Sequence, residues 1–212
     1  MNCWRERKAN LKYDILYVFY MILALFFYVR QNSPEVFGEK GIQNFSGLVG
    51  AILYNDLFFL RVMILLPLCI VVLLRIRAFF REQYIIRKKN RKRIYLAILG
   101  VCLRESLLFS VLFSVFLLGA GKIFYGELGA GFAKEAGTLL YITFGIFFTM
   151  NIVSVSLKWI MGNDIAGIVV ICGLGISDSI TCYNSVHIAL AVILAAVILL
   201  SAEKKEFYLE KY

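Results

Sequence analysis

The chain has 212 residues, of which 61% are hydrophobic and 17% are charged, and its formal net charge is +9 with a mean hydropathy of +0.79. Soluble domains hold about 45–50% apolar and about 25% charged residues, and disordered chains are poor in apolar residues, so the composition excludes both classes. It predicts instead an all-α membrane protein, in which the basic residues are separated from the apolar ones.

Six apolar stretches are candidate transmembrane helices. They are Leu11–Val29, Leu57–Leu74, Leu96–Gly119, Thr138–Leu157, Ile165–Cys182 and Val186–Ser201. A helix needs about 20 residues to cross the bilayer core, so the last two are short. None of the stretches alternates with a period of two, as the strands of a membrane barrel do. The sequence therefore predicts a single transmembrane domain over residues 1–212 with about six helices.

The basic residues fall mostly on one side of this arrangement. Four lie in residues 1–12, nine in residues 75–93, one is Lys158 and three lie in residues 202–212, which makes 17 of the 23. The alternate loops hold four, and Arg61 and Arg104 fall inside apolar stretches. Because Lys and Arg are enriched in cytoplasmic loops, the split predicts a multi-pass protein of the cell membrane with both termini in the cytoplasm.

Two of the basic segments are amphipathic. Residues 1–12 combine Trp4 with several cations, which predicts an interfacial amino-terminal helix. In Ile76–Lys88 the apolar residues recur at steps of three and four, which predicts a short helix along the inner membrane surface. This basic loop could simply set the topology, bind anionic lipid or dock a cytoplasmic partner. We do not expect it to bind nucleic acid, because it has no room for a folded module.

The external connections are predicted mainly as glycine-rich coil. Residues 31–56 begin with turn-forming residues, and Phe45–Tyr54 is expected at the outer interface or as an extension of the second span. Residues 120–137 contain four glycines between positions 121 and 131, which disfavours a helix there. Pro67 lies within the second span and is expected to kink it.

Charged residues inside the spans are candidates for function. Arg104 and Glu105 lie about a third of the way into the third span, and Asp178 lies near the outer end of the fifth. A charge at the centre of a membrane helix costs about 2.5–3.5 kcal/mol on insertion scales, so it usually faces a partner or a cavity. Sequence neighbours point in different directions on a helix, so Arg104 and Glu105 are not expected to neutralise each other. They could line a translocation path with Asp178, contact another span or subunit, or reach toward the inner surface.

Enzymatic chemistry is weakly represented. His187 is the only histidine, and with Cys182 it supplies at most two of the three or four ligands that zinc needs. A Cys–His nucleophile pair is conceivable across a turn. In small six-span cysteine peptidases, however, the histidine precedes the cysteine and lies on the cytoplasmic side, whereas here Cys182 precedes His187 and both are expected on the external side.

A nucleotide-binding motif is also missing. Gly121 and Lys122 resemble the Gly-Lys pair of a phosphate-binding loop, but the other residues of that motif are absent. We therefore expect no metal, no cofactor and no catalytic site in this chain.

The pattern of spans and charges resembles the membrane subunits of type-2 ABC exporters, especially small bacterial permeases encoded with peptide-antibiotic export or immunity systems. A basic amino-terminal segment leads into Leu11-Lys12-Tyr13-Asp14, and an external loop follows the first span. The second span ends in Leu73-Leu74-Arg75-Ile76-Arg77, before the amphipathic basic loop. The resemblance covers the whole chain, but the family often has re-entrant helices between spans five and six, where this chain has only a few residues.

This resemblance implies a permease that moves a peptide, antibiotic or lipid-like substrate with energy from a separate cytoplasmic ATPase. The loop after the second span would be the coupling helix, and its contacts with the ATPase would be Arg77, Phe80, Arg81 and Tyr84. A six-span subunit is half of such a transporter, so a homodimer or a pairing with a sister permease is implied. The alternatives are a stand-alone substrate-binding or uptake component, an intramembrane peptidase, and a scaffold or immunity protein.

Overall fold

The computed structural model describes residues 3–33, 42, 44–55, 59–80, 91–125, 132–161 and 184–201, and every element in these ranges is a helix. The α-helices are α1 (Cys3–Asn32), α3 (Phe45–Gly50), α4 (Leu66–Ile76), α6 (Arg91–Tyr125), α7 (Phe132–Met161) and α10 (Asn184–Ser201). Two π-helices, η2 (Ala51–Asn55) and η3 (Phe59–Leu65), precede α4, and the 3₁₀-helix η4 (Arg77–Phe80) follows it. The predicted all-α class is confirmed for this part of the chain.

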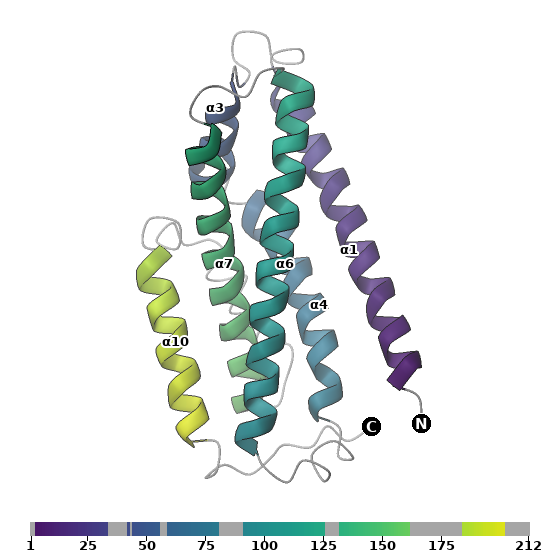
Figure 1. Ribbon diagram of the computed structural model, residues 1–212, viewed down its shortest axis with the longest axis vertical. Helices are drawn as coiled ribbons and strands as arrows, with labels where there is room; N and C mark the ends of the chain where they lie inside the picture. The colour runs from purple at the N-terminus through teal and green to yellow at the C-terminus, as the bar shows by residue number, and fades with distance from the viewer. Residues whose placement is uncertain are drawn as a thin grey trace.

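The helices form an elongated bundle (Figure 1). We call the end where α4 finishes at Ile76 and α6 begins at Arg91 the lower end, as it is drawn in the figure. α1 runs from the lower to the upper end, α4 returns, α6 ascends and α7 descends. α10 starts beside the upper half of α7, where the hydroxyls of Tyr141 and Ser185 lie 2.6 Å apart, and runs down in the same direction as α7.

Three helical segments are long and apolar enough to cross a membrane: Lys12–Asn32, Lys92–Tyr125 and Ala133–Met161. Two shorter apolar helices, Met63–Ile76 and Ser185–Leu200, overlap the predicted second and sixth spans. The predicted fifth span, 165–182, lies outside the described residues. The described helices thus match five of the six predicted apolar stretches, whereas the count of six spans stays a prediction.

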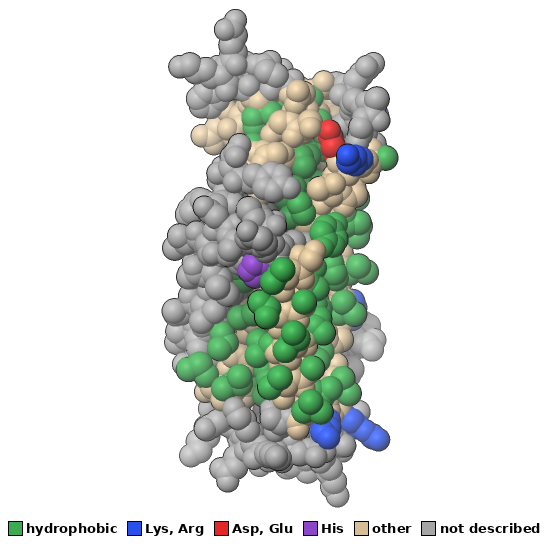
Figure 2. Space-filling view, turned by 90° about the vertical axis from the view of Figure 1, so that its left-hand side faces the viewer, with side chains coloured by type: hydrophobic (Ala, Val, Ile, Leu, Met, Phe, Trp, Pro, Cys, Tyr) green, Lys and Arg blue, Asp and Glu red, His purple; other side chains and the backbone are tan. Residues whose placement is uncertain are grey.

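The core and the exterior of the bundle are both apolar. α7 is the most enclosed of the three long helices, with 67% of its most apolar stretch buried, and it packs between α6 and α10. Large hydrophobic side chains are also exposed along α1, α6 and α10, among them Phe19, Leu107 and Ile193. In Figure 2 hydrophobic side chains cover most of the described surface, and Lys and Arg side chains lie mainly toward its ends. Soluble monomers rarely expose so continuous an apolar surface.

Two predicted boundaries are wrong. Residues 3–12 are not one of them: they form the first turns of α1, which is one continuous helix from Cys3, and their place at the membrane interface stays a prediction. The 120–137 loop is shorter than expected, because α6 continues to Tyr125 and α7 begins at Phe132. Lys158, assigned to a cytoplasmic loop, lies in the last turn of α7 with a buried side chain. At both of these ends the helix continues beyond the local signal that suggested an end.

The stretch that follows the first external loop is buried. α3 begins with Asn44 as its N-cap, whose side chain accepts a hydrogen bond from the Gly47 amide at 2.7 Å. Phe45 and Leu48 of α3 and Ile52 of η2 belong to the core, and α3 contacts α6 and α7 at the upper end of the bundle. This stretch is therefore packed into the bundle at its upper end.

Pro67 lies where the helix type changes, at the junction of η3 and α4. The π-helix η3 ends at Leu65, and Pro67 occupies the first turn of α4. Proline is well tolerated in the first turn of an α-helix, because that position needs no intrahelical amide hydrogen bond. The helix changes from π- to α-helical geometry directly ahead of the proline, and a kink at Pro67 stays a prediction.

Candidate functional site

Four charged side chains from three helices meet inside the lower half of the bundle. Arg75, in the last turn of α4, donates from Nη1 to Oε1 of Glu105 on α6 and from Nη2 to Oδ2 of Asp14 on α1. Only 12% of the Arg75 side chain and 3% of the Glu105 side chain are exposed. This charge cluster of Asp14, Arg75, Arg104 and Glu105 therefore ties α1, α4 and α6 together from within.

Arg104 joins the cluster from the outside of α6. Its Nε and Nη2 atoms donate to Oε1 of Glu105 at 2.9 and 2.5 Å. The expectation that these neighbours would not neutralise each other is wrong, because the long arginine side chain folds back along the helix. The Arg104 side chain is nevertheless 65% exposed, on a face shared with Leu103 and Leu107.

The cluster is formally neutral, with two carboxylates and two guanidinium groups. Taking a single ion out of water costs several kcal/mol, and pairing with additional hydrogen bonds offsets that cost. Glu105 accepts three hydrogen bonds from the two arginines and is the most buried member. Asp14 keeps one oxygen, Oδ1, buried without a hydrogen-bond partner in the part of the chain that the structure describes. The charge balance explains how Glu105 can lie in an apolar bundle.

A polar seam runs between α6 and α7 above and below the charge cluster. Asn151 Nδ2 donates to Ser106 Oγ at 2.9 Å, and the hydroxyls of Tyr95 and Ser156 lie 3.2 Å apart. We define the polar seam by these four residues. Ser110 and Ser114 continue the buried row along α6 at four-residue steps, and the Oγ atom of Ser114 and Oδ1 of Asn151 have no hydrogen-bond partner among the described residues. Polar groups buried inside apolar helix bundles usually mark a helix contact or a path for a polar ligand.

The predicted coupling residues begin directly below the charge cluster. Arg77 is exposed and is the first residue of η4, two positions after Arg75. Phe80 is the last residue of η4, but its side chain is not among those that the structure describes. Arg81 and Tyr84 lie outside the described residues. The structure thus shows where the predicted coupling segment starts, at the lower end of α4.

The other predicted site residues are not brought together. Asp178 and Cys182 lie outside the described residues. His187 is half-buried in the first turn of α10, well above the charge cluster in the bundle. The described cysteine side chains, Cys69 and Cys102, are buried and unoxidised. Within the described ranges no three His, Cys, Asp or Glu side chains are grouped as metal ligands would be.

No protein-family model, curated protein or solved structure matches this chain. Its function therefore has to be inferred from geometry and charge. The charge cluster is the most specific feature for that purpose, because four ionisable groups from three helices meet there and two of them, Arg75 and Glu105, are largely buried.

Sequence reasoning missed two members of the cluster. The apolar pattern of the second span ends at Leu74 and so places Arg75 in the basic loop, whereas α4 continues to Ile76. The same pattern places Asp14 only near the start of the first span. In the structure Arg75 follows the buried Val72 by three residues and so continues the inward side of α4.

Proposed function

We propose that this chain is the permease subunit of an ATP-driven ABC exporter of the cell membrane. It crosses the membrane about six times, with its lower end in the cytoplasm, and it takes its energy from a separate ATPase subunit. The second half of the transporter is a second copy or a sister permease. Its substrate is a peptide, an antibiotic or a lipid-like molecule.

One observation carries the proposal: Arg75 connects α1 and α6 two residues before η4, where the predicted coupling segment begins. A permease must pass a movement of its cytoplasmic partner into its helices, and such transitions use contacts with discrete arrangements. Any displacement of η4 pulls on α4, and the ion pairs of Arg75 transmit it to α1 and α6. A segment that only set the topology would need no such connection.

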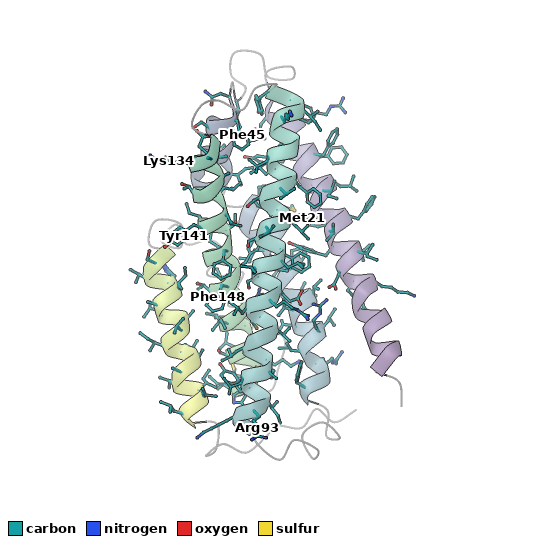
Figure 3. The ribbon with its side chains drawn as sticks, viewed as in Figure 1. Met21, Phe45, Arg93, Lys134, Tyr141 and Phe148 are labelled. Atoms are coloured by element: carbon teal, nitrogen blue, oxygen red, sulfur yellow. The ribbon has the colours of Figure 1, made fainter. Side chains whose placement is uncertain are left out.

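Two further features support a membrane transporter. Arg93 and Lys134 mark the opposite ends of the long helices in Figure 3, and the apolar surface extends between these ends. The lower end receives most of the basic residues of the sequence, as the positive-inside rule requires of a cytoplasmic face. The polar seam offers groups that a polar part of a substrate could contact inside the bundle.

The test is co-purification with the ATPase from the native cell in mild detergent. We expect Phe80→Asp combined with Tyr84→Asp to reduce the recovered ATPase at least tenfold, because two aromatic contacts are replaced by buried charge. The matched control is Gln83→Asp with Asn90→Asp, which adds the same charge to the same loop and should keep the ATPase. Retention of the ATPase by the aromatic double variant, or its absence from the wild-type preparation, would overturn the proposal.

A further inference from the structure

An apolar groove with a volume of about 410 Å³ lies between α1 and α4, two helices that diverge toward the lower end of the bundle in Figure 1. Four positions on each helix form its walls: Tyr13, Leu16, Tyr17, Tyr20, Pro67, Ile70, Val71 and Leu74. Across a groove the facing side chains of two helices do not touch, so packing contributes less to their attachment than it does between closely packed helices. The attachment of α1 to α4 therefore depends strongly on the contacts at the two ends of this groove.

Polar contacts join the two helices at both of these ends. At the upper end the buried Tyr17 hydroxyl donates to the carbonyl oxygen of Ile64 at 2.9 Å. The Tyr17 ring also meets Phe109 of α6 edge to face, with the ring centroids 4.9 Å apart. At the lower end the carboxylate of Asp14 accepts a hydrogen bond from Arg75 and so bridges the groove. α1 is thus held by uncharged contacts above and by an ion pair below.

The two carboxylates of the charge cluster are held very differently. Glu105 accepts three hydrogen bonds from two arginines, and 3% of its side chain is exposed. Asp14 is bonded at Oδ2 to Arg75, its Oδ1 atom has no hydrogen-bond partner among the described residues, and 25% of its side chain is exposed. The charged groups that act on Asp14 are Arg75 from α4 and Arg104 and Glu105 from α6. Asp14 is therefore the acid of the cluster that is better placed to take up a proton.

We propose that Asp14 is a proton-sensitive latch, which in its charged form holds the lower end of α1 against α4 and in its neutral form releases it. Protonation at Oδ1 removes the negative charge, so the attraction between opposite charges is lost and only a neutral acceptor, Oδ2, faces Arg75. Arg75 keeps its second carboxylate, Glu105, so α4 stays attached to α6. The lower end of α1 then moves away from α4, while the contacts of Tyr17 hold the helix above.

The direction of the response follows from the charge that the latch requires. The ion pair exists only while Asp14 is ionised, so α1 is held at high pH and is released as the pH falls through the titration of this carboxyl. In the proposed permease the latch decides whether α1 follows a displacement of α4 that begins at η4. That consequence rests on the proposed function, whereas the latch itself depends only on contacts within the chain.

The latch is tested by measuring the distance between two spin labels by pulsed electron paramagnetic resonance, in the purified protein in lipid nanodiscs. The labels are attached at Ile15→Cys on α1 and Leu74→Cys on α4, both exposed positions, in a cysteine-free background. We expect the distance to shift to longer values between about pH 8 and about pH 4, a range that includes the titration of ordinary aspartates. A control pair at the upper end, Phe27→Cys with Ile123→Cys, should keep its distance throughout.

Variants of Asp14 show whether this carboxyl is the group that takes up the proton. Asp14→Asn, which has nearly the same shape and cannot ionise, should show the longer distance at every pH. Asp14→Glu should keep the pH response, because it retains an ionisable carboxyl. A wild-type distance that does not change with pH would overturn the inference, whatever the variants do. So would a pH response that persists in Asp14→Asn, or an equal change in the control pair. Because no ATPase is present, these results stand apart from the co-purification test.

Discussion

Arg75 links helices that are far apart in the sequence, since its partners are Asp14, 61 positions away, and Glu105, 30 positions away. Its two Nη atoms are divided between the two carboxylates, so it holds α1 and α6 at once. Lysine, with a single compact ammonium group, would not span the two acids in the same way. At the residue scale this geometry makes Arg75 the side chain on which the lower half of the bundle depends most.

Replacing Arg75 by methionine should destabilise the protein strongly. The change leaves the carboxylates of Asp14 and Glu105 in an apolar environment, with only Arg104 still in contact with Glu105. Removing one partner of a buried ion pair typically costs about 3–5 kcal/mol. We expect a clear fall in the temperature of unfolding in detergent.

A triple variant shows whether unpaired charge or lost packing explains this loss of stability. Asp14→Asn, Arg75→Met and Glu105→Gln together remove the stranded charges, and this variant should recover most of the stability that Arg75→Met loses. Arg104→Met, on the exposed side of the cluster, should cost little. If the triple variant were as unstable as Arg75→Met alone, steric packing and not charge would explain the role of Arg75.

At the scale of single elements, α6 shows how tertiary packing extends a helix beyond its local propensity. It continues past Gly119 and Gly121 to Tyr125, although each glycine costs about 1 kcal/mol relative to alanine. The compensation is visible at Gly121, where a Cβ atom would lie 2.7 Å from Cε2 of Phe45. The missing side chain lets α3 approach α6, so the glycine that suggests a loop in fact serves a helix contact.

Gly121→Ala should therefore destabilise the protein, by about 1–3 kcal/mol, because the ring of Phe45 has to move out of its place in the core. Gly119→Ala is the matched control: nothing lies within 4 Å of the position of its Cβ atom, so the better helix propensity should stabilise the protein slightly. Thermal unfolding of both variants in the same detergent gives the comparison. Phe45→Leu added to Gly121→Ala should restore part of the loss, and equal behaviour of the two alanine variants would contradict this assignment.

At the scale of the whole molecule, the asymmetry of charge between the two ends of the bundle determines its proposed orientation. Arg93 lies at the lower end of α6, and Lys122 and Lys134 lie toward the upper end. The basic segments predicted for the cytoplasm all join helices at the lower end, including the loop between α4 and α6. Retention of many cations on one face is what orients a helical membrane protein during insertion.

Labelling of single cysteines in a cysteine-free background tests this orientation. With a membrane-impermeant maleimide, Lys122→Cys and Lys134→Cys should react in intact cells, whereas Lys88→Cys and Lys204→Cys should react only after the membrane is permeabilised. The opposite pattern would invert the orientation. Labelling of all four positions in lysed cells shows that each cysteine is reachable in principle.

The sequence by itself determined the helical class, the five apolar stretches that the described helices contain, and the uneven distribution of the basic residues. These are local properties, because a helix satisfies its backbone hydrogen bonds within one segment, so its existence can be read from a window of about 20 residues. The predicted ends of the third and fourth spans were less accurate, because α6 continues past Gly121 and α7 continues past Lys158. Contacts with other helices decide whether a helix continues at such positions.

Only the tertiary structure decided which charges meet and which faces remain open. The pairing of Arg75 with Asp14 and Glu105, the contact of Phe45 with Gly121, and the groove between α1 and α4 all join residues at least 30 positions apart. The periodicity of a single helix shows which residues share a face, but it does not show which neighbour that face meets. That depends on how several helices pack at once, and it is the packing that turns scattered charges into a cluster at the base of the bundle.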